Sequence, residues 1–223
     1  MFYFRLNKLR ILDNRTDSFL FFKRDLATVK ILSFVTTENT DLPNLELWLN
    51  EADPVKKQAA LATAVAEVIA SRVLIPIDRV KDNQTMTFGD TGYVVFESAK
   101  IPDNFNWCFL AMKDERQERE IGQLLSGLIA DPEFATFSSS LGTLIMGAAN
   151  PIFAAAVEVA KFATGLAAKI LTSKGDQQIG LLYTSLDRQE HYPHGVRNSD
   201  DVPDLTGNIL VDYTIFAAET SQS

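Results

Sequence analysis

The sequence predicts an α+β protein in which an antiparallel β-sandwich carries a three-helix insertion and one additional helix. Short runs that alternate apolar and polar residues recur near both ends of the chain and in its middle. Polar turns, rather than helical crossovers, separate most of these runs, which favours antiparallel pairing. A helical block rich in Ala and Gly interrupts them. We therefore expect a single domain, 1–223, with sandwich strands in 1–50, 73–114 and 176–218 and the helical insertion in 115–172.

The first strand is predicted between Phe2 and Ile11. Apolar residues alternate from Phe2 to Leu6, the phase slips by one at Asn7-Lys8, and the alternation resumes at Leu9. A β-bulge, which inserts one extra residue into a strand, produces such a slip. The same alternation, or a short apolar run, predicts further strands at 20–22, 27–35, 73–77, 85–88, 93–96, 107–112, 179–186 and 209–216.

Two connections between these strands carry signals of their own. The segment Phe88-Gly-Asp-Thr-Gly-Tyr93 has spaced glycines and predicts a hairpin turn between two strands. Residues 187–208 are rich in polar residues, Pro and Gly, and they predict a long loop before the last strand. A loop of this length is unusual for a simple connection, so it is a candidate binding rim.

Three of the four helices predicted after residue 50 begin with an Asp-Pro or Asn-Pro pair. The exception is the first helix of the insertion. Asp53-Pro54 opens a helix that runs to about Arg72, because aspartate caps free amides and proline is tolerated at the first helical position. Asp131-Pro132 and Asn150-Pro151 repeat this pattern. The insertion is therefore predicted to contain three helices, over 115–130, 132–148 and 151–171.

Composition excludes some classes of function. The formal net charge of −8 and the pI of about 4.8 argue against nucleic acid as a partner, because phosphate backbones are bound by clustered Lys and Arg. The single cysteine, Cys108, lies in an apolar run, which predicts a buried structural thiol and no internal disulfide. The N-terminus alternates apolar and polar residues and lacks a signal-peptide core, so we expect a cytoplasmic protein or one exported without a cleaved signal peptide.

The helical block is unusually apolar. From Phe134 to Val157 there is no ionisable side chain, so the block must be covered by the protein's own core, by another chain or by a membrane. Asn150-Pro151 interrupts the run, and each half is near or below the length that crosses a bilayer. This favours a helical layer on a sheet, or a homo-oligomer formed through the block. Insertion of the block into a membrane as a hairpin remains the alternative.

Four aspartates predict a cation site. Asp13 and Asp17 follow the first strand, Asp114 follows the strand that ends at Met112, and Asp176 precedes Ile179-Gly180. Hard cations such as calcium prefer several oxygen ligands supplied by different loops. If the loops meet at one end of a sandwich, these carboxylates converge there. The common structural alternative is that loop aspartates form turns and helix caps.

The order of these residues resembles that of C2 domains, over about half of the chain. An aspartate pair after a strand, a later strand that ends in an acidic residue, and Asp176-x-x-Ile-Gly before another strand carry the resemblance. It implies an eight-stranded sandwich whose rim loops bind calcium and engage membranes or proteins. It also requires the helical block to lie inside a rim loop, between Asp114 and Asp176. Arg116 departs from the family pattern, because an acidic residue is usual two positions after Asp114.

A second candidate metal site lies in the predicted polar loop. Glu190, His191, His194 and Asp204 are the residue types that bind zinc or manganese, and they would suit a metal-dependent hydrolase. Pro193 prevents both histidines from lying on one helix, so the pattern differs from the zinc-protease motifs. No Gly-x-Ser-x-Gly sequence and no glycine-rich phosphate loop occurs in the chain.

These observations predict a non-enzymatic binding module. Its sandwich rim loops, assisted by calcium, would engage a protein or a membrane surface. The alternative is a membrane-active protein of the pore-forming or toxin type, in which the apolar helical hairpin inserts into bilayers.

Overall fold

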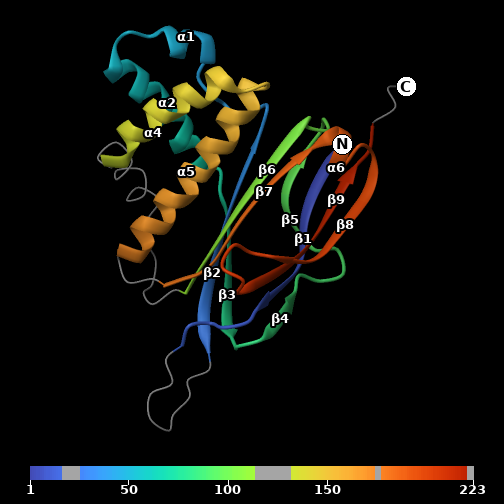
Figure 1. Cartoon of the computed structure of the whole chain (residues 1–223). Helices are drawn as coiled ribbons and strands as arrows, with labels where there is room; N and C mark the ends of the chain where they lie inside the picture. The colour runs from blue at the N-terminus through green and yellow to red at the C-terminus, as the bar shows by residue number, and fades with distance from the viewer. Residues whose placement is uncertain (17–25, 114–131, 174–176, 220–223) are drawn as a thin grey trace.

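The computed structural model describes residues 1–16, 26–113, 132–173 and 177–219. They form two antiparallel β-sheets and a layer of helices that covers the outer face of one sheet (Figure 1). The predicted α+β class and its two antiparallel sheets are therefore confirmed. The predicted strand at 20–22 and the predicted helix at 115–130 lie outside the described residues.

The first sheet has five strands and contains both ends of the described chain. Its order is β4-β1-β9-β8, and β5 also pairs with β1. The bulge predicted at Asn7-Lys8 is confirmed, because the register between β1 and β9 shifts between Leu6 and Lys8. The strands are β1 (Phe2–Ile11), β4 (Gln84–Thr87), β5 (Tyr93–Ser98), β8 (Gly195–Pro203) and β9 (Ile209–Ala217).

The second sheet has four strands in the order β3-β2-β6-β7. Its central strand β6 is buried on both faces, since every residue from Asn104 to Met112 is buried. Both neighbours of β6 run antiparallel to it. The strands are β2 (Ala27–Thr37), β3 (Val73–Val80), β6 (Asn104–Lys113) and β7 (Gln177–Asp187).

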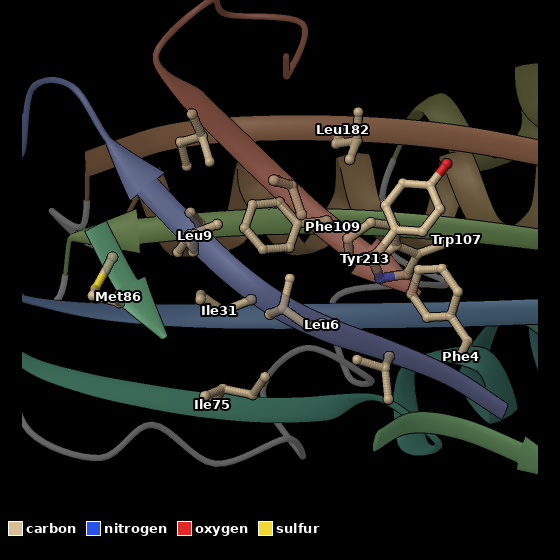
Figure 2. Packing of buried hydrophobic residues seen from close by; sticks show 14 of the residues in the cluster. Phe4, Leu6, Leu9, Ile31, Ile75, Met86, Trp107, Phe109, Leu182 and Tyr213 are labelled. Carbon is tan, nitrogen blue, oxygen red and sulfur yellow. The ribbon is translucent and has the colours of Figure 1, made fainter. Parts of the chain in front are cut away.

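A single apolar core joins the two sheets. Phe4 of β1 contacts Trp107 of β6 and Tyr213 of β9, with ring centroids 4.7 and 5.1 Å apart (Figure 2). Tilted and edge-on contacts of this kind add to the stabilisation that apolar burial provides. The core is completed by further side chains from these three strands and from β2, β3, β4, β5 and β7, among them Leu6, Leu9, Ile31, Ile75, Met86, Phe109 and Leu182.

A second apolar core lies between the four-stranded sheet and the helices. Leu32, Phe34, Cys108 and Leu110 project from the outer face of the sheet into it. Trp48 is buried there, as expected for a core tryptophan. The helices are α1 (Leu45–Asn50), α2 (Pro54–Ala70), α4 (Pro132–Gly147) and α5 (Pro151–Ser173), and a single turn, α6 (Arg188–His191), follows β7.

The predicted caps of two helices are confirmed. Asp53 accepts the backbone N–H of Val55 at 2.9 Å, and Pro54 is the first residue of α2. Asn150 accepts the backbone N–H of Phe153 at 3.1 Å at the start of α5. Both side chains satisfy amides that have no partner within the helix.

Three details of the sequence-based prediction are wrong. Residues 45–50, placed in the sandwich, form α1, so more than one helix precedes the insertion. The predicted hairpin at 88–92 does not exist, because β4 and β5 run in the same direction along one edge of β1. The predicted loop at 187–208 contains α6 and the edge strand β8, whose polar residues and bulge conceal the strand pattern.

The close packing of β7 against β9 predicts opposite effects of two glycine substitutions. A Cβ at Gly180 would collide with the side chain of Ile209, whereas a Cβ at Gly165, on the surface of α5, meets nothing within 4 Å. We expect Gly180→Ala to lower the free energy of unfolding by about 1–3 kcal/mol. Gly165→Ala should raise it by about 0.5–1 kcal/mol, because alanine is the better helix former. Urea denaturation measures both, and equal effects would contradict the close contact at Gly180.

Candidate functional site: the sandwich rim and the helical tip

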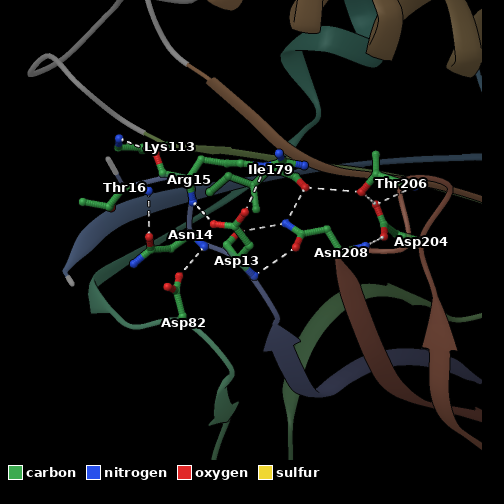
Figure 3. A network of polar contacts seen from close by, with 10 residues as sticks. All are labelled: Asp13, Asn14, Arg15, Thr16, Asp82, Lys113, Ile179, Asp204, Thr206 and Asn208. Atoms are coloured by element: carbon green, nitrogen blue, oxygen red, sulfur yellow. Dashed lines mark hydrogen bonds and ion pairs between the residues drawn. The ribbon is translucent and has the colours of Figure 1, made fainter. Parts of the chain in front are cut away.

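One end of the sandwich, which we call the rim, is where β1, β3 and β6 end and β7 begins. Lys113, the last residue of β6, pairs with Gln177, the first residue of β7. The Nζ atom of Lys113 donates a hydrogen bond of 2.9 Å to the backbone oxygen of Arg15 (Figure 3). The topology therefore brings the immediate neighbours of Asp13, Asp114 and Asp176 to the same end of the molecule.

The structure describes one of the four predicted calcium ligands. The carboxylate of Asp13 is exposed, accepts the backbone N–H of Arg15 at 2.8 Å and lies 3.9 Å from Arg15 Nε. Asp17, Asp114 and Asp176 lie outside the described residues. In the part of the chain that the structure describes, no group of three or more His, Cys, Asp or Glu side chains has a geometry that could hold a metal ion. The calcium site therefore stays a prediction.

An asparagine anchors the first rim loop. Asn14 is fully buried, and its Nδ2 atom donates to the backbone oxygen of Val80 at 2.8 Å. Its backbone N–H donates to Asp82 at 2.8 Å, and its Oδ1 atom accepts the N–H of Thr16 at 2.9 Å. These bonds tie the end of β1 to the turn after β3. Arg15, the next residue, has a left-handed backbone with φ of 59°.

Asp204 is the centre of the rim network and is 5 % exposed. Its Oδ2 atom accepts the N–H of Leu181 at 2.8 Å and both the N–H and the hydroxyl of Thr206, at 3.2 and 2.6 Å. Its Oδ1 atom accepts the N–H groups of Asn208 and Ile209, at 2.8 and 2.9 Å. One buried carboxylate thus binds the turn between β8 and β9 to the edge of β7.

Asn208 extends this network to the first rim loop. Its Nδ2 atom donates to the backbone oxygens of Asp13 and Ile179, and its Oδ1 atom accepts the N–H of Asp13 at 2.9 Å. The rim groups that the structure describes are thus largely committed to structural hydrogen bonds. The sequence pattern placed Asp204 in a candidate metal site, and it gave no sign of this buried role, which depends on contacts with residues far apart in the chain.

Substitution of Asp204 tests the network. Asp204→Asn replaces one acceptor oxygen with a donor NH₂ group that faces backbone N–H groups. Because buried donors without an acceptor are costly, we expect the free energy of unfolding to fall by about 3 kcal/mol in urea denaturation. Asp200→Asn, on the exposed side of β8, is the matched control and should change it by less than about 0.5 kcal/mol. Equal effects of the two substitutions would show that the network contributes little.

Calcium binding at the rim is tested by thermal unfolding. A site that binds calcium only in the folded state raises the melting temperature, and the rise grows with the logarithm of the calcium concentration above the dissociation constant. We expect a rise of roughly 3 °C at millimolar calcium, since about 1 kcal/mol shifts the melting temperature of a chain this size by 2–4 °C. Asp13→Asn combined with Asp176→Asn should abolish the rise, and Asp90→Asn, in the loop between β4 and β5, should keep it. No shift in the unsubstituted protein would remove calcium from consideration.

The structure separates the residues of the second candidate metal site. His191 ends α6, and its Nδ1 atom accepts the backbone N–H of Asp187 at 3.1 Å. His194 is exposed directly before β8, whereas Asp204 follows the far end of that nine-residue strand. Because a strand rises about 3.3 Å per residue, Asp204 and the histidines cannot share one metal ion.

The apolar helical block lies on the outer face of the four-stranded sheet. A row of small residues on α5 is buried against the sheet, including Ala155, Ala156, Ala160 and Ala163. Burial raises the pKa of the Cys108 thiol beneath it to about 12, so this thiol is protonated and unreactive near neutral pH. The predicted buried cysteine is confirmed.

A polar row crosses the same sheet face under the first turns of α5. Asn106 donates to Thr36 Oγ1 at 3.3 Å, and Ser185 donates to Asn106 Oδ1 at 2.8 Å. Thr36 in turn donates to the backbone oxygen of Ala156 at 3.1 Å. The beginning of α5 is therefore held by hydrogen bonds as well as by apolar contact.

The turn between α4 and α5 leaves aliphatic side chains in solvent. Leu144, Met146 and Ile152 are 41, 72 and 49 % exposed, and we call these three residues the helical tip. The tip lies within the uncharged run from Phe134 to Val157, and no other uncharged run in the sequence is half as long. Across a groove of about 340 Å³, the tip residue Met146 faces Leu49 and Pro54, where α1 ends and α2 begins.

One described helix, α5, is long and apolar enough to cross a membrane by length and composition. The candidate span is Pro151–Thr172, and half of its most apolar window is buried inside the protein. Helices from the core of a soluble protein meet the same criterion, so the finding is compatible with both readings of the helical block.

Comparison with known proteins identifies no family for this chain. No protein-family model matches it, and no curated protein matches it in sequence.

Proposed function

We propose that this protein is a non-enzymatic interaction module that works by contact with a partner surface. The observation that supports this proposal is the helical tip, where Leu144, Met146 and Ile152 are exposed in a stretch without charge. Exposed apolar groups that lie together commonly mark interaction sites. The described rim residues also favour a contact function over catalysis, because their polar groups are used in hydrogen bonds that stabilise the fold.

The rim loops are the second proposed contact surface. In this proposal the sandwich is C2-like, and Asp13, Asp17, Asp114 and Asp176 supply oxygens to calcium or to a basic partner. The support is topological, since the paired Lys113 and Gln177 adjoin Asp114 and Asp176 and Lys113 reaches the loop of Asp13. The helical insertion then emerges from the rim and returns to it.

The alternative is a membrane-active protein whose α4–α5 hairpin leaves the sheet and crosses the bilayer. Two observations favour it. The segment Pro151–Thr172 meets the length and composition criteria for a membrane span. The face of α5 toward the sheet is largely alanine, and each buried alanine contributes less apolar stabilisation than a leucine would. This alternative requires release of vesicle contents, which the first proposal does not.

Substitution of the helical tip tests the contact proposal. In the tip variant, Leu144→Ser, Met146→Ser and Ile152→Ser are combined. The control combines Val196→Ser and Leu205→Ser, two side chains that are also exposed but lie on and after β8. Self-association is measured by sedimentation velocity and membrane association by vesicle flotation. We expect the unsubstituted protein to show at least one of these two associations. That association should be weakened tenfold or more in the tip variant and unchanged in the control, because three aliphatic groups buried at the contact contribute several kcal/mol.

The same vesicle experiment distinguishes the membrane-active alternative from the contact module. Release of an entrapped dye by the unsubstituted protein would favour the membrane-active reading, and association without release would favour the contact module. If the unsubstituted protein shows neither association, or if the tip variant behaves like the control, the helical tip is not the contact surface.

A further inference from the structure

We propose that the partner of the helical tip is the interfacial region of an uncharged lipid bilayer, into which the tip inserts without the helices leaving the sheet. This inference rests on the proposed function, because it names the partner of the same surface. It differs from the membrane-active alternative, because no helix crosses the bilayer and no contents are released.

The first support is the chemistry of the exposed groups. The residues of the tip are aliphatic, and no Arg, Trp or Tyr lies between Phe134 and Val157. The side chains that dominate protein–protein contacts are Trp, Tyr and Arg. Ionisable groups are disfavoured in hydrocarbon, and the tip has none. The surface therefore complements an apolar, uncharged phase better than it complements a protein partner.

The second support is the way the backbone is satisfied at the turn between the helices. Asn150 caps the start of α5 through Phe153 N–H, and the N–H of Ala148 donates to the oxygen of Ile145 at 3.3 Å. These bonds lower the cost of leaving water. The other carbonyls of the last turn of α4 have no donor within the helix and need water or headgroups. The tip can therefore enter the headgroup boundary, but it is not suited to the hydrocarbon centre.

The third support is the distance along α5 from the tip to the first charges of that helix. Along α5 the first ionisable residues are Glu158 and Lys161, which form an ion pair of 2.9 Å. Ile152 precedes Glu158 by about 9 Å of helix, given a rise of 1.5 Å per residue. Amphipathic surface helices are buried about 5–10 Å into the boundary between headgroups and acyl chains. The uncharged length of the tip matches this depth.

The fourth support is a pair of exposed aliphatic side chains at the same end of the helical layer. Leu47 of α1 and Val55 of α2 are each more than 70 % exposed. Gly142 of α4 packs against α1, since a Cβ there would lie 3.8 Å from the side chain of Leu49. Figure 1 shows α1 and the turn between α4 and α5 at the same end of the layer, away from β4 and the rim. Several exposed aliphatic side chains thus lie at this end of the helical layer.

An environment-sensitive fluorophore tests the insertion directly. Met146→Cys and the control Val196→Cys are each labelled with a nitrobenzoxadiazole dye near neutral pH, where the buried Cys108 does not react. Vesicles of phosphatidylcholine alone, and vesicles that also contain phosphatidylserine, are added at low and high salt. We expect a blue shift and at least a twofold rise in emission for the label at position 146 only. This change should occur on both vesicle types and at both salt concentrations, and the vesicles should not release an entrapped dye.

A second variant tests the same inference without a label. Met146→Glu places a charge at the tip and should weaken flotation with phosphatidylcholine vesicles at least tenfold, whereas Val196→Glu should not. Circular dichroism and thermal unfolding confirm that each variant is folded.

The other outcomes overturn the inference in distinguishable ways. A spectral change at position 146 that depends on protein concentration, and not on vesicles, identifies a second copy as the partner, so that the contact function stands and the lipid assignment fails. Binding that requires phosphatidylserine and disappears at high salt indicates that charged residues elsewhere in the protein bind the vesicles, so the assignment of an uncharged bilayer to the tip fails. Dye release supports the membrane-active alternative. No change at position 146 under any condition removes both the lipid partner and the proposed contact surface.

Discussion

The burial of β6 on both faces is the constraint on which the rest of the structure depends. Phe105, Trp107 and Phe109 point into the core between the sheets, and Cys108 and Leu110 point into the core beneath the helices. A strand that is apolar on both sides requires a layer over each face of its sheet. The five-stranded sheet supplies one layer and the helices supply the other. The apolar helical block is thus a structural requirement of the sheet as well as a candidate contact surface.

The two ends of the molecule differ in how their backbone groups are satisfied and in which side chains are exposed. At the rim, strands from both sheets end together, and buried polar groups such as Asp204 and Asn208 satisfy the backbone that the turns leave unpaired. At the helical tip, the Asn150 cap and one turn hydrogen bond satisfy part of the backbone locally, and the aliphatic side chains of the tip are exposed. A surface whose side chains do not hold the fold together is the one that is available to a partner.

Much of the fold could be predicted because its signals are local. Alternation gave the strands, the slip at Asn7-Lys8 gave the bulge, and Asp53-Pro54 and Asn150-Pro151 gave the starts of α2 and α5. β8 was missed because it is an exposed edge strand, with a bulge between Ser199 and Val202 that breaks any alternation. The hairpin at 88–92 was predicted wrongly because its glycine signal is only local. Glycines permit a reversal of the chain, but the pairing of β4 and β5 with β1 decides whether the chain reverses.

By itself, the sequence determined the fold class, the caps, the buried cysteine and the uncharged stretch around the tip, because each depends on neighbouring residues. Only the tertiary structure decided the role of Asp204, which depends on Leu181 and Ile209 coming close together. It also decided which aliphatic residues of the helical block are covered by the sheet and which face solvent. Those outcomes depend on the packing of distant elements, and no local pattern encodes that packing.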